Sequence, residues 1–230
     1  MQIATFTHTS VASLVASKSW LKPLLKTINN TRCRAWDFIH GVETCGDIPL
    51  ATLNFQSKNK TSGLEYQSHH PAVIRAGLLM LAIRPEEFIF IDFGCGKGRA
   101  LLVASELPFR KIIGLEFAPV LAESARRNVE NYRSRRQKCS QIEILTVDAT
   151  EYALTPEPQI LYFYSPFSRS VMDQVLDNIE TSLRQSPRDL LVMFSGAIGV
   201  RDRVFASCTQ YKLLQRGRYI DIYRHRSCGI

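Results

Sequence analysis

Short apolar runs alternate with longer amphipathic stretches through most of this 230-residue chain. Because these runs are apolar at nearly every position, we expect strands that are covered on both faces, as in a parallel sheet. Five such runs predict five strands, at Phe88–Asp92, Lys111–Glu116, Gln141–Val147, Ile160–Tyr164 and Asp189–Phe194.

Apolar residues recur at helical spacing in the stretches between these runs. We expect helices over Val73–Ile83, Arg99–Glu106, Pro119–Tyr132 and Ser170–Ser186. Two last runs flank Gly217 and predict an antiparallel hairpin, at Tyr211–Leu214 and Tyr219–Tyr223. The pattern therefore predicts an α/β fold with a doubly wound, Rossmann-like sheet of seven strands, mostly parallel and ending in an antiparallel hairpin.

The first part of the chain has a different pattern. No acidic residue precedes Asp37, and lysines stand between apolar residues near helical spacing, with Pro23 interrupting them. A helix that packs on the main domain is favoured over a membrane-surface helix or an organelle transit segment. The polar residues 46–65, broken by glycine and proline, predict an irregular connection or lid. We expect a helical and irregular N-terminal extension with lid over residues 1–63 and the main domain over 64–230.

Composition narrows the class of protein. The chain is 45% hydrophobic and 22% charged with a net charge of +8, which permits a nucleic-acid partner without favouring one. We expect no transmembrane segment, because no window approaches ~18 consecutive apolar residues. The six cysteines form no C-x-x-C pair and no metal-ligand pattern, so we expect reduced thiols, no metal and a cytoplasmic location. The oligomeric state stays open.

The segment between the first expected strand and its helix reads Asp92-Phe93-Gly94-Cys95-Gly96-Lys97-Gly98-Arg99. Alternate glycines let a backbone approach a bound group closely, and a helix start offers free N–H groups and partial positive charge. The glycine spacing departs from the dinucleotide fingerprint, because Arg99 stands at the position of its third glycine. Asp92 suits a cationic amino group better than a pyrophosphate. These details favour S-adenosylmethionine, which carries an ammonium and no phosphate.

Two further carboxylates end the next two expected strands. Glu116 is placed to hold both ribose hydroxyls, although an exposed strand-end acid is an alternative. Asp148 can accept from the adenine amine while Ala149 donates from its backbone, and a turn aspartate is the alternative there. Three acids at three successive strand ends favour one shared site.

The fourth expected strand ends in Tyr164-Ser165-Pro166-Phe167. An aromatic ring beside a proline gives a rigid platform next to a sulfonium, with cation–π stabilisation. An ordinary strand-to-helix turn is the alternative.

These motifs, in this order over about residues 64–224, resemble the class I S-adenosylmethionine-dependent methyltransferases. Asp92 to Gly98 looks like motif I, and Tyr164 to Phe167 looks like motif IV. The resemblance implies a cofactor site at Asp92, Phe93, Gly94, Cys95, Gly96, Gly98, Arg99, Glu116, Phe117, Asp148, Ala149 and Tyr164. It implies catalytic roles for Ser165, Pro166 and Phe167.

The chain is also similar to a group of poorly characterised bacterial methyltransferases. The similar stretches are Asp92 to Leu102, Pro108 to Glu116 and Gly41-Val42-Glu43-Thr44. That group often has Asn-Pro-Phe where this chain has Ser165-Pro166-Phe167. A looser resemblance to non-SET protein lysine methyltransferases would place Tyr66 at the methyl-transfer site; a packed loop aromatic is the alternative.

We therefore expect a methyltransferase with an unidentified acceptor, either a protein side chain or a small molecule. A non-catalytic S-adenosylmethionine-binding scaffold and an NAD-linked oxidoreductase are the competing hypotheses. No residue stands out as a general base; His69 and His70 are candidates, and surface polar residues are the alternative.

Overall fold

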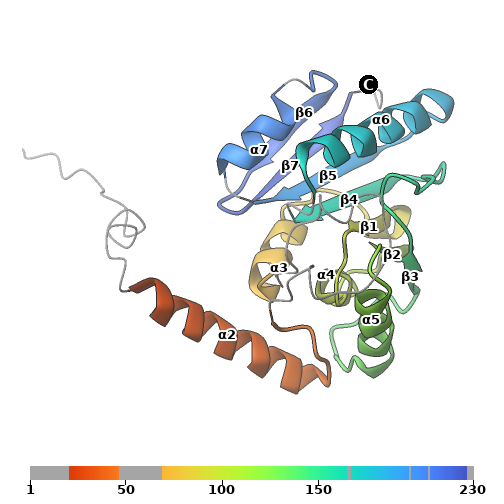
Figure 1. Cartoon of the computed structure of the whole chain (residues 1–230). Coiled ribbons are helices and arrows are strands. Elements are labelled where there is room, and N and C mark those ends of the chain that lie inside the picture. The colour runs from red at the N-terminus through yellow and green to blue at the C-terminus, as the bar shows by residue number, and fades with distance from the viewer. Residues whose placement is uncertain (1–20, 47–68, 165–166, 197, 207, 227–230) are drawn as a thin grey trace, which may run out of the picture.

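A computed structural model describes residues 21–46, 69–164, 167–196, 198–206 and 208–226 (Figure 1). One seven-stranded sheet runs through it in the order β3-β2-β1-β4-β5-β7-β6. The strands are β1 (Ile89–Phe93), β2 (Lys111–Glu116), β3 (Ile142–Thr146), β4 (Gln159–Tyr164), β5 (Leu190–Ser195), β6 (Tyr211–Arg216) and β7 (Ile220–His225).

The predicted sheet is confirmed. Strands β1 to β5 pair in parallel, whereas β7 pairs antiparallel with both β5 and β6. Every residue of β1 and β5 is buried, as expected for strands covered on both faces. The expectation is wrong for β3, which lies at one edge of the sheet and exposes Glu143 and Thr146.

Helices cover both faces of the sheet. The first face carries α3 (Pro71–Leu79), α4 (Arg99–Ala104) and α5 (Pro119–Asn131), whose apolar residues pack with Phe90, Ile112 and Tyr162. The second face carries α6 (Arg169–Gln185) and α7 (Ile198–Phe205), which pack with Ile91, Phe163 and Val192. A short 3₁₀ turn, η3 (Pro85–Glu87), leads into β1.

Two helices, α3 and α4, have boundaries that differ from the predicted ones by more than a residue; α3 begins two residues earlier, at Pro71. The helix expected over Val73–Ile83 ends at Leu79, and the Met80 N–H donates to the Gly77 carbonyl after it. The α4 helix stops at Ala104, and the Ser105 hydroxyl donates to the Leu102 carbonyl, an alternative to the helical pattern. The pattern also missed α7, an eight-residue helix without a strong apolar stripe.

The N-terminal extension contains a helix, α2 (Leu21–His40), with Pro23 in its first turn, where a proline is tolerated. Figure 1 shows α2 extending away from the sheet, with its C-terminal end near α4 and α5. Cys33 and Asp37 are buried and Trp36 packs against the core, whereas Phe38 and Ile39 are exposed. The expected lid falls mostly on residues 47–68, outside the described residues. No helix in the described part of the chain has the length and apolar character to cross a bilayer.

Candidate cofactor site

The glycine-rich loop turns sharply between β1 and α4. Gly94, Gly96 and Gly98 have φ values of +86°, +54° and +85°, in the left-handed region that other residues rarely adopt. The Gly94 and Cys95 N–H groups both donate to the Leu115 carbonyl at 2.9 Å. The loop is therefore fastened to the end of β2.

A second glycine makes room for this loop. A Cβ atom at Gly114, on β2, would lie 2.6 Å from Leu101 Cδ1 and 2.8 Å from Cys95 Sγ. A side chain there would therefore push the loop and α4 away from the sheet. Cys95 itself is buried, and burial raises the pKa of its thiol well above the ordinary value.

Asp92 lies on β1 directly before the loop and is 3% exposed. Among the described residues, no hydrogen bond reaches its carboxylate. Burial, with the charge of Glu116 adding to it, raises the pKa of Asp92 well above its ordinary value. A buried carboxyl without donors is costly as an anion, and a bound cation would relieve that cost. The residue present therefore fits an ammonium group.

Glu116 ends β2 and is 4% exposed. Its Oε2 accepts from the Gly96 N–H and its Oε1 from the Ala118 N–H, both at 2.9 Å. Burial raises the pKa of Glu116 to about 7, and the backbone N–H groups act in the opposite direction. Each oxygen keeps lone-pair capacity beyond these bonds, so the carboxylate fits a pair of hydroxyl donors.

Asp148 follows β3, in the turn after the strand. Its Oδ1 accepts from the Thr150 N–H at 3.0 Å and from the Thr150 hydroxyl at 2.8 Å, a local turn pattern. Ala149 beside it is buried. The order β3-β2-β1 places the ends of these three strands side by side, as expected for one shared site.

The remaining predicted residues fall in different places. Phe93 is buried against Phe163 on the α6 side of the sheet, the face opposite to Asp92. Phe117 is half-buried directly after Glu116, and Phe167 packs against the α6-side core. Tyr66, Ser165 and Pro166 lie outside the described residues, so their expected catalytic roles stay predictions.

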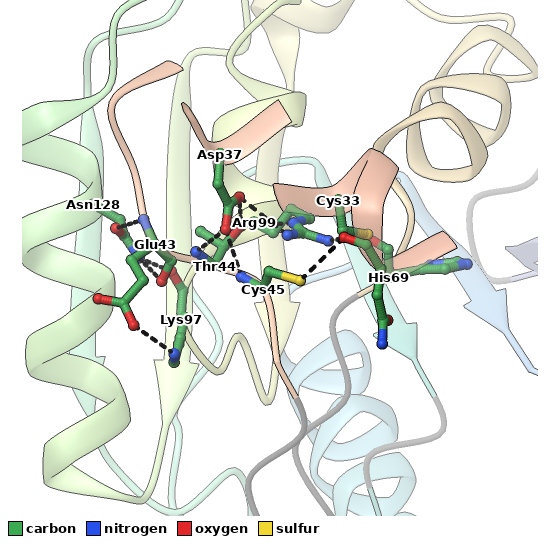
Figure 2. Close-up of polar contacts among 10 residues, drawn as sticks. Cys33, Asp37, Glu43, Thr44, Cys45, His69, Lys97, Arg99 and Asn128 are labelled. Atoms are coloured by element: carbon green, nitrogen blue, oxygen red, sulfur yellow. Dashed lines mark hydrogen bonds and ion pairs between the residues drawn. The ribbon is translucent and has the colours of Figure 1, made fainter. Parts of the chain in front are cut away.

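Arg99, expected at the cofactor, directs its side chain toward the N-terminal extension (Figure 2). It is 3% exposed and forms an ion pair with Asp37 at 3.1 Å. Its Nε donates to the Thr44 hydroxyl at 2.6 Å, and one terminal nitrogen lies 3.0 Å from Cys33 Sγ. The arginine that follows the glycine loop therefore holds the end of α2.

Asp37 completes this buried network from its own side. Its carboxylate accepts from the N–H and hydroxyl of Thr44, both at 2.7 Å, and from the Cys45 N–H at 2.6 Å. Asn128 of α5 exchanges two hydrogen bonds with the Glu43 backbone and donates to the Lys97 carbonyl (Figure 2). The segment after α2 is thus joined to α5 and to the glycine loop.

A second polar cluster lies at the ends of β4 and β5. His69, just before α3, stacks on the Tyr164 ring with centroids 4.2 Å apart. Its Nδ1 lies 2.5 Å from the Tyr162 hydroxyl and its Nε2 3.4 Å from the Ser195 hydroxyl. Burial, with the charges of His70 and Arg99, lowers the pKa of His69 to about 4, so the imidazole is neutral near pH 7.

The sequence did not indicate the contacts of several of these residues. Asp37 carried a signal, as the first acidic residue of the chain, and Thr44 closes one of the stretches with a family resemblance. Tyr162 and Ser195 carried none, because Tyr162 lies within an apolar strand run and Ser195 directly follows another. The described residues hold no cluster of three or more His, Cys, Asp or Glu side chains suited to a metal ion.

No family model matches the chain, and no curated protein matches its sequence. Solved structures do match. A putative RNA methyltransferase from Pyrococcus horikoshii gives a TM-score of 0.50 at 16% identity over 76% of this chain and 93% of that chain. A predicted N6-adenine-specific DNA methylase from Listeria monocytogenes gives 0.49 at 13% identity, over 69% of this chain and 51% of that chain.

A riboflavin-derivative dimethyltransferase from Streptomyces davawensis gives a TM-score of 0.49 at 13% identity, over 67% of this chain and 54% of that chain. The present chain thus spans about half the length of this protein and of the Listeria protein. The fold is that of the class I S-adenosylmethionine-dependent methyltransferases. The narrower resemblance to one bacterial group stays a prediction.

Proposed function

We propose that this protein is an S-adenosylmethionine-dependent methyltransferase. The single observation that carries the proposal is the pair of buried carboxylates at the ends of β1 and β2, with the glycine loop between them. Asp92 is buried, and none of the described residues donates a hydrogen bond to its carboxylate. A bound ammonium would supply both hydrogen-bond donors and a positive charge. Glu116 accepts one hydrogen bond from the glycine loop and one from the Ala118 N–H after β2, and both oxygens keep lone pairs for hydroxyl donors.

The proposed cofactor site contains the glycine-loop backbone, Asp92 and Glu116, with Asp148-Ala149 at the adenine end. When bound, S-adenosylmethionine supplies a methyl group already activated on a sulfonium, so the protein contributes position and exclusion of water. Tyr164 is proposed to lie near the sulfonium. Catalytic roles for Tyr66, Ser165, Pro166 and Phe167 are part of the proposal. The acceptor is proposed to be a protein side chain or a small molecule.

Calorimetry with S-adenosylhomocysteine and NAD tests the cofactor. We expect S-adenosylhomocysteine to bind and NAD to give no heat of binding. Asp92→Asn and Glu116→Gln should each weaken binding at least tenfold, because each removes a charge-assisted hydrogen bond. Asp173→Asn, a matched change at an exposed carboxylate on α6, should leave binding unchanged. Binding of NAD alone would favour an oxidoreductase and refute the proposal.

A second experiment separates an enzyme from a binding scaffold. Labelled S-adenosylmethionine is incubated with the protein and a cell extract, and label is measured in protein, nucleic-acid, lipid and small-molecule fractions. Transfer that disappears with Asp92→Asn supports the enzyme and names the acceptor class. Tight cofactor binding with no label in any fraction supports the scaffold.

A further inference from the structure

A buried tyrosine lies next to Asp92 on the neighbouring strand. Tyr162 of β4 is the register partner of Asp92 on β1, and both side chains lie on the α3 side of the sheet. Tyr162 is 1% exposed, and its phenol feels the charge of Asp92. Burial, with the charges of Asp92 and Tyr164, raises the pKa of Tyr162 well above its ordinary value, although a hydrogen bond with Ser195 acts in the opposite direction. The hydroxyl therefore keeps its hydrogen.

The neighbouring hydrogen bonds indicate which atom accepts the hydrogen of the Tyr162 hydroxyl. Ser195 Oγ donates to the Tyr219 carbonyl at 3.1 Å, so toward His69 it acts as an acceptor. The His69 Nε2 3.4 Å away then carries the imidazole hydrogen, and Nδ1 is the acceptor nitrogen. The Tyr162 hydroxyl therefore donates to His69 Nδ1, at 2.5 Å.

This assignment leaves the Tyr162 oxygen with lone pairs only. Its hydrogen is used on the imidazole, so the atom offers acceptor capacity on the strand that pairs with Asp92, on the same face of the sheet. Two neighbouring acceptors, one of them a buried anion, match a group with several N–H donors and a positive charge. A single neutral donor would leave the carboxylate charge uncompensated.

We propose that Tyr162 is a second acceptor, beside Asp92, for the ammonium group of the methyl donor, and that His69 is the positioning residue that holds the Tyr162 hydrogen away from it. This inference rests on the proposed function. The neutral imidazole is essential to it, because a protonated His69 would donate through Nδ1 and turn the Tyr162 hydrogen toward the ammonium.

Two probes test the proposal by calorimetry: S-adenosylhomocysteine and its deaminated counterpart, in which hydrogen replaces the amino group. Tyr162→Phe should weaken binding of S-adenosylhomocysteine about tenfold or more, because a hydrogen bond to a charged group is lost. Binding of the deaminated probe should change less than twofold. Tyr211→Phe, which removes another buried hydroxyl on β6, should change neither.

His69 is tested by a double-mutant cycle. His69→Phe keeps a ring that can stack on Tyr164 but removes the acceptor for the Tyr162 hydroxyl. It should therefore weaken the binding of S-adenosylhomocysteine and leave the binding of the deaminated probe unchanged. The double variant with Tyr162→Phe should bind no more weakly than Tyr162→Phe alone, because both changes remove one interaction. His69→Gln, which keeps an acceptor oxygen, should recover part of the affinity.

Two results would overturn the proposal. Equal losses for both probes would mean that Tyr162 has a structural role, and additive losses in the double variant would separate His69 from Tyr162. If Tyr162→Phe does not fold, the His69→Phe comparison of the two probes decides alone. A failure of the unaltered protein to bind S-adenosylhomocysteine refutes the proposed function itself, which distinguishes the two failures.

Discussion

Asp37→Asn should detach the N-terminal extension from the domain. The side chain keeps its size but loses the charge that faces Arg99, which is 3% exposed and has its ion-pair oxygen 3.1 Å away. The amide also has only one acceptor oxygen, whereas both carboxylate oxygens of Asp37 accept hydrogen bonds from Thr44 and Cys45. The variant therefore leaves a buried arginine without its counter-charge.

The expected magnitude follows from that burial. Removing one partner of a buried ion pair destabilises a protein by about 3–5 kcal/mol. For a chain of this size each kcal/mol lowers Tm by about 2–4 °C, so a fall of ~6–20 °C is expected. The matched control is Asp189→Asn, whose partner Arg224 is 45% exposed, and an exposed pair of this kind contributes about 0–1 kcal/mol.

Thermal unfolding and hydrogen exchange together measure the effect. Calorimetric scans give Tm, and exchange at residues 33–45 reports whether the extension opens before the domain unfolds. Faster exchange there, with the Tm of the domain unchanged, would mean that the network holds only the extension. A variant within 1 °C of the unaltered protein and with unchanged exchange at these residues would refute the reasoning.

Two further predictions concern β2, which packs against the glycine loop. Glu116 has a folded-state pKa of about 7 against 4.5 for the free group, so its folded form binds the proton more tightly. The ligand-free protein should therefore lose up to about 3 kcal/mol of stability at this group as pH rises from 4.5 to 7, and urea unfolding of Glu116→Gln should lack that loss. Gly114→Ala should lower the free energy of unfolding by ~1–3 kcal/mol in the same assay, because its Cβ would meet Cys95 and Leu101. It should also weaken the binding of S-adenosylhomocysteine. Gly199→Ala on α7, with no atom within 4 Å of its Cβ, should be neutral or stabilising, and equal losses at both glycines would contradict the account.

The sheet was predictable because its strands are short, apolar and separated by helical periodicity. The burial of β3 was predicted wrongly, because the sequence of a strand does not reveal whether the strand lies at the edge of its sheet. The helix α7 was missed because its eight residues lack a strong apolar stripe.

The candidate carboxylates were predictable for a different reason. Parallel strands end at the same edge, so acids that follow successive strands lie together whatever the rest of the chain does. The partner of Arg99 was not predictable, because Asp37 is 62 positions away and the pair forms only when α2 reaches α4. Tyr162 was hidden in the same way, since an apolar run does not reveal which hydroxyl its tyrosine meets.

The two hydrogen bonds that Glu116 accepts from the backbone have a consequence for affinity. The carboxylate fixes the Gly96 and Ala118 amides in the ligand-free chain, so the glycine turn is already formed when a ligand arrives. The conformational entropy of that turn is therefore lost during folding and not during association. A preorganised loop of this kind makes binding tighter without any added contact, and Glu116→Gln should make the entropy of association less favourable.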